Sequence, residues 1–345
     1  KQTNNAIKFL MAQYRAIFNH AYFKGLATAA LVPVAMAAGQ AQAASGTFAD
    51  FISGSSKTDV KGNFTLSKTE SLSQSAGGYL TNLTIANGGN LTFGDGSKAN
   101  TGHIRVSGTV EVQSGGTLTL KGINKNGSGI VHTFDESFKD NTNSKLVVNQ
   151  GSVTVTGSQI QMNRVELNNS IVSIGTNIGD KTSSDFDDNA QINANTAYDD
   201  ADTHISGTGT FLVTGDKTKI TLDSGSILNA AVFNFDGGAI DMKGDEAASS
   251  GAMIRAYSNG GKVAAEINFQ GTDLNITDSG NYIGGKVVNL KTGSDIKLAD
   301  SAELHLSGVL ETAGDIAASN HAGTINLDGA AITLSGSNSK LIIDV

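Results

Sequence analysis

The sequence contains no cysteine, no tryptophan and a single proline among 345 residues. Because disulfides cannot form, packing and backbone hydrogen bonds must stabilise the fold. Charged residues make up only 16% of the chain, which excludes disorder driven by charge repulsion. Aromatic residues make up 6%, without the recurring aromatic signature of propeller blades. The composition therefore predicts a folded chain that is stabilised by packing and hydrogen bonds along its length and not by crosslinks.

Glycine is abundant, at 42 residues, and one glycine-rich stretch shows how the chain is organised. Residues 104–120 read IRVSGTVEVQSGGTLTL, with apolar residues in pairs at positions i and i+2. This is the period of a β-strand, whose successive side chains point to opposite faces. The linkers SGT and QSGG are too short for a crossover helix and do not match the two-residue turns of tight hairpins. The pattern therefore predicts a chain that keeps coiling in one sense, as a solenoid does.

Similar pairs recur along most of the chain after residue 82. Consecutive pairs commonly begin six to nine residues apart, so three pairs would complete a coil of roughly 20 to 24 residues. At that length the chain would form up to about 13 coils, fewer once loops are subtracted. Residues 121–144 and 180–203 lack the alternation and are predicted to be loops. The predicted core pairs are Leu83/Ile85, Leu91/Phe93, Ile104/Val106, Val110/Val112, Leu118/Leu120, Leu146/Val148, Val153/Val155, Ile160/Met162, Val165/Leu167, the run from Ile171 to Ile174, Phe211/Val213, Ile220/Leu222, Phe233/Phe235, Ile240/Met242, Ile267/Phe269, Leu274/Ile276, Val288/Leu290, Ile296/Leu298, Leu304/Leu306, Ile325/Leu327, Ile332/Leu334 and Leu341/Ile343.

The N-terminus has the three parts of a secretory signal peptide. Residues 1–24 contain four basic residues and no acidic one, and residues 25–38, GLATAALVPVAMAA, form an apolar run. Ala41 and Ala43 form an A-x-A cleavage site, which predicts cleavage between Ala43 and Ala44. The apolar run is shorter than the roughly 20 residues needed to span a bilayer, which argues against a membrane anchor. The sequence therefore predicts export.

Three regions follow from these patterns: a signal peptide with an extended basic segment at 1–43, an N-terminal cap at 44–82 and a β-helix at 83–345. Four of the 24 basic residues and none of the 32 acidic ones lie in residues 1–43, so the remaining chain has a formal charge of −12. That charge opposes nucleic acid and anionic membranes as partners. Because the last residues, LIIDV, lie within a predicted strand, we expect an incomplete C-terminus.

Three segments carry a resemblance to a known family: SGTVEVQSGGTLTL, NGGNLTFGDGS and AGTINLDGAAITLSG. They resemble the passenger region of monomeric autotransporters, the type V secreted proteins of Gram-negative bacteria. The resemblance implies an all-β fold, a right-handed parallel β-helix, displayed at the cell surface and preceded here by a signal-peptide helix. The long basic segment resembles the extended signal peptides of that family. The sequence departs from the family because it lacks the C-terminal translocating barrel that would anchor it.

A serine protease is one alternative, because some autotransporters carry a chymotrypsin-like domain. Asp223, Ser224 and Gly225, preceded by Leu222, are similar to the nucleophile region of such proteases. The same triplet also has the composition of an ordinary corner between two strands. The histidines after the signal peptide are scattered and have no neighbours that would orient a catalytic base: His103, His132, His204, His305 and His321. The corner is the preferred interpretation.

The densest acidic region offers weak candidates for Ca²⁺ ligands, since clustered carboxylates supply the oxygen atoms that Ca²⁺ prefers. These candidates are Asp185, Asp187, Asp188, Asp199, Asp200 and Asp202. No EF-hand spacing is present, and the segment at 88–96, GGNLTFGDG, fails the calcium-binding nonapeptide pattern. A solvated loop is the preferred interpretation, and no metal or other cofactor is predicted.

A polysaccharide-cleaving β-helix enzyme is the main alternative from another functional class. Such enzymes gather Asp, Lys or Arg on one face, whereas Arg105, Arg164 and Arg255 are far apart in this sequence. The segment at 215–218, GDKT, does not have the spacing of a phosphate-binding loop. The leading hypothesis is therefore an adhesin or self-associating protein without enzymatic activity. It would present a flank of Thr, Asn, Ser and Asp to a surface glycan, a protein or a second copy. A passive stalk or surface-layer component is a third possibility.

Overall fold

The structure is a computed structural model, and it confirms the parallel β-helix. The residues it describes are 46–56, 58–73, 75–97, 102–122, 130–131, 143–175, 190–194, 197–198, 205–206, 209–245, 251–256, 265–307 and 323–344. Within these ranges the single helix is α2 (Phe48–Ile52), and nearly all other regular structure is parallel β-strand. The predicted signal-peptide helix, with the cleavage site at Ala43 and Ala44, lies outside the described residues.

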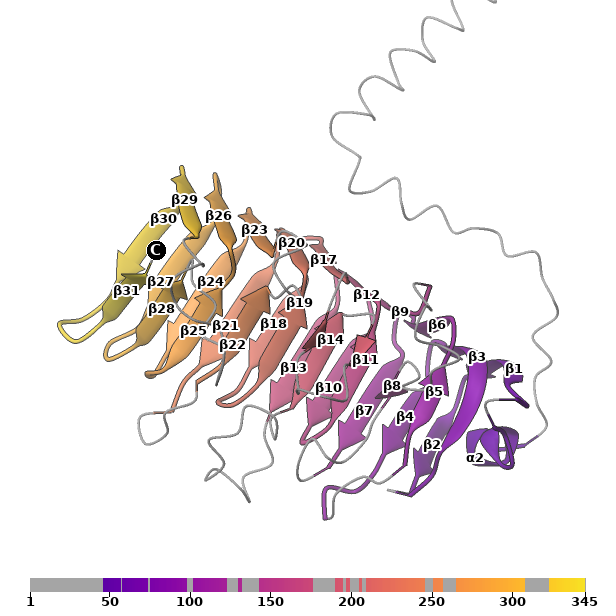
Figure 1. The fold of residues 1–345 in the computed structure, drawn as a ribbon. Helices are drawn as coiled ribbons and strands as arrows, with labels where there is room; N and C mark the ends of the chain where they lie inside the picture. The colour runs from indigo at the N-terminus through magenta and orange to yellow at the C-terminus, as the bar shows by residue number, and fades with distance from the viewer. Residues whose placement is uncertain are drawn as a thin grey trace, which may run out of the picture. The chain divides into compact units, whose positions relative to one another are not determined.

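The strands form three parallel stacks, and each turn of the chain contributes one strand to each stack (Figure 1). The first stack contains β1 (Lys61–Leu66), β3 (Gly78–Ile85), β6 (Thr109–Val112), β9 (Lys145–Asn149), β12 (Arg164–Asn168), β17 (Thr210–Thr214), β20 (Val232–Asp236), β23 (Glu266–Gln270), β26 (Val287–Lys291) and β29 (Thr324–Asp328). The second stack contains β2 (Thr69–Leu72), β4 (Asn90–Phe93), β7 (Thr117–Lys121), β10 (Ser152–Thr156), β13 (Ile171–Gly175), β18 (Lys219–Leu222), β21 (Ala239–Lys243), β24 (Asp273–Thr277), β27 (Asp295–Leu298) and β30 (Ala331–Leu334).

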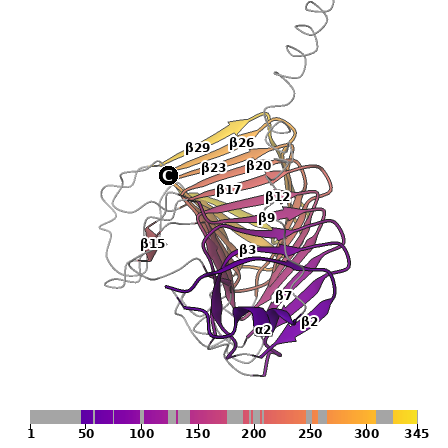
Figure 2. The same ribbon diagram turned by 90° about the vertical axis from the view of Figure 1, so that its right-hand side faces the viewer.

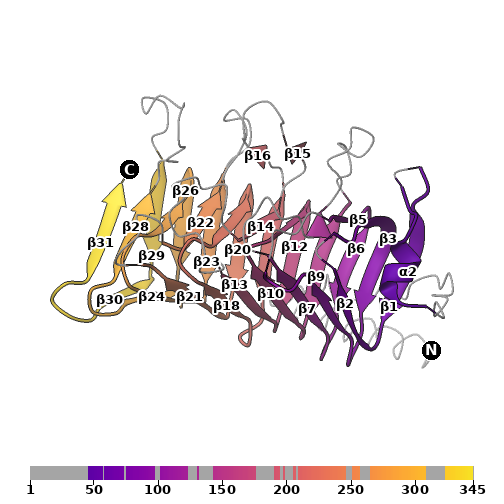
Figure 3. The ribbon, with the colours of Figure 1, turned by 90° about the horizontal axis from the view of Figure 1, so that it is seen from below.

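The third stack begins with the first half of β3, a long strand that belongs to two stacks. It continues with β5 (Ile104–Val106), β8 (Ile130–Val131), β11 (Gln159–Met162), β14 (Gln191–Ala194), β19 (Ile227–Ala230), β22 (Met253–Ala256), β25 (Asn281–Gly284), β28 (Glu303–Ser307) and β31 (Lys340–Asp344). A short antiparallel pair, β15 (Ala197–Tyr198) and β16 (Ile205–Ser206), lies outside the stacks (Figures 2 and 3).

The second stack holds ten strands, one from each turn, so the described part of the chain makes ten turns. The tightest turns fall near the predicted period: Phe211 pairs with Phe233, 22 residues later, and Val153 pairs with Val172, 19 residues later. Other turns are longer because extra residues lie between two strands. The pairing register is nevertheless kept, since a slip of one residue would turn every apolar side chain outward.

The core fills the space between the stacks, and strand after strand alternates buried and half-buried residues. All predicted pairs from Leu83 to Leu306 are buried, with the exception of Ile171, which is 56% exposed beside buried Val172. Four phenylalanines from three successive turns pack together in the core: Phe211 on β17, Phe233 and Phe235 on β20, and Phe269 on β23. The inward face was therefore assigned correctly from the alternation.

The corner between the first and second stacks requires a backbone conformation that glycine adopts easily. In the linker QSGG, Gly115 has a φ of 75°, and the Gly116 N–H donates to the carbonyl of Gln113 at 2.8 Å. A side chain at a positive φ is strained, whereas glycine carries no such cost. This tight turn explains how so short a linker redirects the chain without a hairpin.

The N-terminal end of the stacks is covered by α2. Phe48 and Ile52 are buried against the first turn, and the rings of Phe48 and Phe64 have centroids 4.9 Å apart. Thr47 caps the helix, and the hydrogen bond from its side chain lowers the pKa of Asp50. A helix across the end of a stack shields strand edges that would otherwise be open to pairing.

Glu70 occupies an inward position on β2, in register with Leu91, and connects the first turn to α2. Its side chain is 7% exposed; Oε2 accepts the Phe48 N–H at 2.5 Å, and Oε1 lies 3.2 Å from Lys68 Nζ. The Phe48 N–H is one of the helix N-terminal donors that have no partner within the helix. A buried acid thus replaces an apolar core residue where the helix needs an acceptor.

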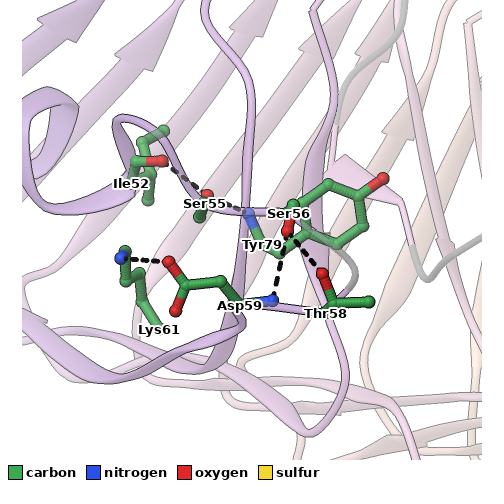
Figure 4. A network of polar contacts seen from close by, with 7 residues as sticks. All are labelled: Ile52, Ser55, Ser56, Thr58, Asp59, Lys61 and Tyr79. Atoms are coloured by element: carbon green, nitrogen blue, oxygen red, sulfur yellow. Dashed lines mark hydrogen bonds and ion pairs between the residues drawn. The ribbon is translucent and has the colours of Figure 1, made fainter.

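A polar network ties the other end of α2 to the strands (Figure 4). Ser55 Oγ donates to the carbonyl of Ile52 at 2.5 Å and accepts the Tyr79 N–H at 2.8 Å. Gly78 allows this approach, because a Cβ there would lie 2.6 Å from Ile52 Cβ. Farther along, the Asp59 carboxylate lies 2.9 Å from Lys61 Nζ. The sequence predicts a cap at residues 44–82. In the structure, α2 covers the end, and β1, β2 and the first half of β3 already form the first turn within that segment.

Two predicted loops contain strands of the third stack. Ile130 and Val131 form β8, which pairs with β5 and β11, although residues 121–144 were expected to be a loop. Likewise, β14 lies within the predicted loop at 180–203, and both its inward residues, Ile192 and Ala194, are buried. Both loop predictions are wrong at these positions. β8 contains only two residues, and one of the two inward residues of β14 is an alanine, so the alternation is hard to detect.

The last turn is more exposed than the sequence predicts. Ile325, Ile332 and Leu341 are half-buried, whereas their partners at i+2 are 46–49% exposed: Leu327, Leu334 and Ile343. These residues point inward like the core pairs before them, but β29, β30 and β31 pair with described strands on one side only. Their burial is consequently incomplete.

Candidate binding surface

The predicted acidic candidates for a metal lie outside the described residues: Asp185, Asp187, Asp188, Asp199, Asp200 and Asp202. Among the residues that the structure describes, no group of three or more His, Asp or Glu side chains is arranged to hold a metal ion. In the same ranges, no helix combines the length and apolar character needed to cross a membrane.

The triplet considered as a protease nucleophile lies in the corner between β18 and β19. The Ser226 N–H donates to the carbonyl of Asp223 at 3.0 Å, and Gly225 has a φ of 75°. This confirms the predicted corner. His103 and His305 are described, and His305 Nε2 lies 3.0 Å from Glu303 Oε1; His132, His204 and His321 lie outside the described ranges.

His103 is the most strongly perturbed titratable group that the structure describes. Burial and, to a smaller extent, the positive charge of Arg105 lower its pKa from 6.5 to about 4. Arg105 itself lies over the ring of Tyr79, with 5.1 Å between the guanidinium carbon and the ring centroid. Both effects disfavour the imidazolium, so His103 is neutral at physiological pH.

Acidification should therefore weaken the first turns through His103. Between pH 6.5 and 4 the unfolded histidine binds a proton and the folded one does not, so stability is complete above 6.5 and falls as pH decreases. We expect His103→Gln to remove on the order of 1 kcal/mol of this pH dependence. Urea denaturation of both proteins at pH 7 and pH 4.5 measures it. Equal losses in the two proteins would contradict the assignment.

On the first stack, outward asparagines form a continuous row, here called the asparagine ladder: Asn234, Asn268, Asn289 and Asn326. Each amide donates to the carbonyl oxygen of the preceding one, at 3.0 Å for Asn268, 2.7 Å for Asn289 and 2.6 Å for Asn326. The register of β20, β23, β26 and β29 aligns them. Because these amides satisfy one another, the ladder stabilises the stack more than it offers groups to a partner.

On β14 and β19 of the third stack, the outward amide side chains are buried rather than exposed. Gln191, Asn193 and Asn229 are each less than 5% exposed and are joined by hydrogen bonds, the shortest being 2.6 Å between Asn229 Nδ2 and Asn193 Oδ1. Arg255 Nε donates to Asn229 Oδ1 at 2.9 Å. We call these four residues the amide cluster. It brings one of the three dispersed arginines next to three amides, a proximity that sequence spacing alone did not indicate.

On the second stack, the outward side differs between its two halves. From β18 onward it carries ion pairs: Lys219 Nζ lies 2.8 Å from Asp241 Oδ2, and Lys297 Nζ lies 3.1 Å from Asp273 Oδ1. Partial burial alone would raise the pKa of Asp241, but the hydrogen bonds from Lys219 and Asn275 lower it. The reciprocal hydrogen bonds raise the pKa of Lys219 and Lys297. This half is charged and internally paired.

From β2 to β18, where the charged half begins, the second stack carries few charges and is rich in hydroxyls. Two parallel rows run along it, and together they are called the hydroxyl face. The longer row contains Ser71, Thr92, Thr119, Thr154, Ser173 and Thr221, and the shorter row contains Thr69, Asn90, Thr117 and Ser152. All are half-buried or exposed. The sequence shows the Thr-x-Thr and Ser-x-Thr elements, but their alignment into rows follows only from the strand register.

Comparison with protein-family models, with curated proteins and with solved structures finds no match. The class that the fold and surface define is therefore a parallel β-helix with ordered polar rows on its outer sides.

Proposed function

We propose that this protein is an exported β-helical passenger, displayed at the cell surface or released from it, that acts in adhesion or self-association. The observation that carries the proposal is the hydroxyl face, because successive turns present the same chemistry to a partner in register. Individually weak contacts repeated along a rigid scaffold add up to strong attachment. The signal-like N-terminus and the resemblance to autotransporter passengers support export and surface display.

Display on a non-adherent bacterium tests the proposal. We expect cells carrying the complete protein to adhere to a glycan- or protein-coated surface, or to aggregate, more than cells carrying an unrelated passenger. Adherent cells and the settling rate of suspensions are the measurements. If neither increases, the passive stalk becomes the better interpretation.

The amide cluster favours one alternative, a polysaccharide-cleaving enzyme. Its three amides are less than 5% exposed, so the groups that a sugar could reach are the half-buried Arg255, held by Asn229, and the Glu303 carboxylate on the same stack. Incubation of the purified protein with a panel of polysaccharides separates the two functions. Release of reducing ends would support the enzyme and count against the adhesin.

A further inference from the structure

The hydroxyl face is a regular two-dimensional array. Parallel strands lie about 4.8 Å apart, and side chains at i and i+2 lie about 6.6 Å apart along a strand. Thr92 pairs with Thr119, and Thr119 with Thr154, while Thr117 pairs with Ser152. Six turns therefore repeat the same group over about 24 Å of the solenoid axis. A partner with its own regular repeat can make the same contact at each turn.

The hydroxyls of this array have unused hydrogen-bonding capacity. Thr69 accepts a hydrogen bond from Asn90 Nδ2 at 3.2 Å. The other hydroxyls of the face form no hydrogen bond with any described residue, unlike the amides of the asparagine ladder. Each hydroxyl can donate one hydrogen bond and accept two. The face is therefore equipped to bond to an external partner that also carries hydroxyls.

The array is also almost free of charge. In the six strands that carry the face, the outward charged residues are Lys121 on β7 and Lys219 on β18, and Lys219 is ion-paired with Asp241, although the chain after residue 43 has a formal charge of −12. A charged partner would find no counter-charge here, and an anionic one would be repelled by the rest of the protein. The scarcity of charge on the face therefore favours a partner that is itself uncharged and forms hydrogen bonds through hydroxyls.

Apolar groups are interspersed among the hydroxyls. Ile171 continues the shorter row and is 56% exposed, and every threonine adds a methyl group. A sugar ring likewise combines hydroxyls with C–H surface, so it can contact both kinds of group on this face. Because β4, β7, β10, β13 and β18 are hydrogen-bonded to neighbours on both sides, binding costs little further ordering of the protein.

We propose that the hydroxyl face binds a neutral, linear polysaccharide whose chain lies along the solenoid axis. The inference rests on the proposed adhesive function and names its partner. Binding is expected to increase with the length of the sugar chain until the ligand spans the six turns, because each turn adds a similar contact. Short oligosaccharides should therefore compete poorly with the polymer.

The test uses the complete purified protein and a triple variant, Thr92→Val, Thr119→Val and Thr154→Val. Valine keeps the β-branched shape that favours strands and replaces the hydroxyl with a methyl group. A matched control carries Thr84→Val, Thr210→Val and Thr324→Val, which lie outward on the first stack. Co-sedimentation with insoluble cellulose, chitin and mannan measures binding, with polygalacturonate as the charged comparison, and circular dichroism verifies folding of every variant.

We expect the unmodified protein and the control to sediment with at least one neutral polysaccharide, and the triple variant to bind it at least tenfold more weakly. Binding that is unchanged in the triple variant would overturn the proposal, as would a preference for polygalacturonate. Failure to bind any neutral polysaccharide while displayed cells still adhere would overturn it and leave the proposed function standing. If the triple variant loses self-association instead, measured by sedimentation velocity, the face is a contact between copies and the proposal fails.

Discussion

Val112→Asp is expected to lower the free energy of unfolding by about 3–5 kcal/mol, the cost of a buried charge without a partner. Val112 is fully buried on β6 and pairs with Ile85 and Val148, which are also fully buried. The deficit should become smaller as the pH falls, because burial raises the pKa of the introduced carboxyl and the neutral form is tolerated better. Urea denaturation at pH 7 and pH 4 measures both effects.

Hydrogen exchange locates the damage. Each turn is supported mainly by its neighbours, so the variant should lose protection around residues 104–120 and keep it in distant strands such as β24. Glu111→Lys is the control: Glu111 points outward, and its change should cost within about 0.5 kcal/mol. Equal protection in the two variants would mean that the inward face of β6 is assigned wrongly.

Phe235→Ala is expected to destabilise the protein by about 3–5 kcal/mol, through lost apolar burial and a cavity. The Phe235 ring stacks on Phe269, with centroids 4.9 Å apart and planes 8° apart, and on Phe233, with centroids 5.6 Å apart. Phe211 lies at 6.2 Å on the other side. The Phe235 ring contacts all three other rings, so its removal takes a packing partner from each of them. The alanine side chain is too small to fill the volume that the ring occupied.

Asp236→Ala, at the next position and exposed, is the matched control and should cost within about 0.5 kcal/mol. Urea denaturation followed by circular dichroism measures both variants. A loss below about 1 kcal/mol for Phe235→Ala would contradict tight packing of the rings, because a well-packed phenylalanine cannot be truncated so cheaply.

Most of the core could be predicted because each of its strands pairs two large apolar residues across one polar residue. Val110 and Val112, or Leu118 and Leu120, show this without reference to the rest of the chain. The single error within the buried blocks is Ile171, where apolar residues at consecutive positions hide which one points inward.

Strands of the third stack were harder to recognise for a physical reason. In β19 the outward Ile227 is buried as well as the inward Leu228, and the second inward residue is the small Ala230. A strand covered on both sides loses the contrast between its faces, so alternation no longer marks it. β14 was concealed inside a predicted loop for a similar reason. Its sequence is QINA, in which the outward positions are amides and the second inward residue is the small Ala194.

The hydroxyl face could not be predicted in full, although its residues are plain in the sequence. Thr119 lies 27 residues after Thr92 but 35 residues before Thr154, and no single repeat length aligns the three. The alignment depends on how many residues separate consecutive strands, and only the backbone pairing shows which residues come into register. The amide cluster has the same origin, since Asn193 and Arg255 are 62 residues apart and two strands away.

The hydrogen bonds between turns have a mechanical consequence. Bonds such as Thr117 N–H to Gly89 O, at 2.9 Å, and Ser152 N–H to Gly116 O, at 3.0 Å, run from turn to turn, along the axis of the solenoid. A force that pulls its ends apart therefore loads the interfaces between turns in series, and each carries the whole tension. When one interface opens, a tight turn of 22 residues releases about 70 Å of chain. Under tension such a protein would lengthen by steps, turn after turn, and dissipate work at each one while the remaining turns stay intact.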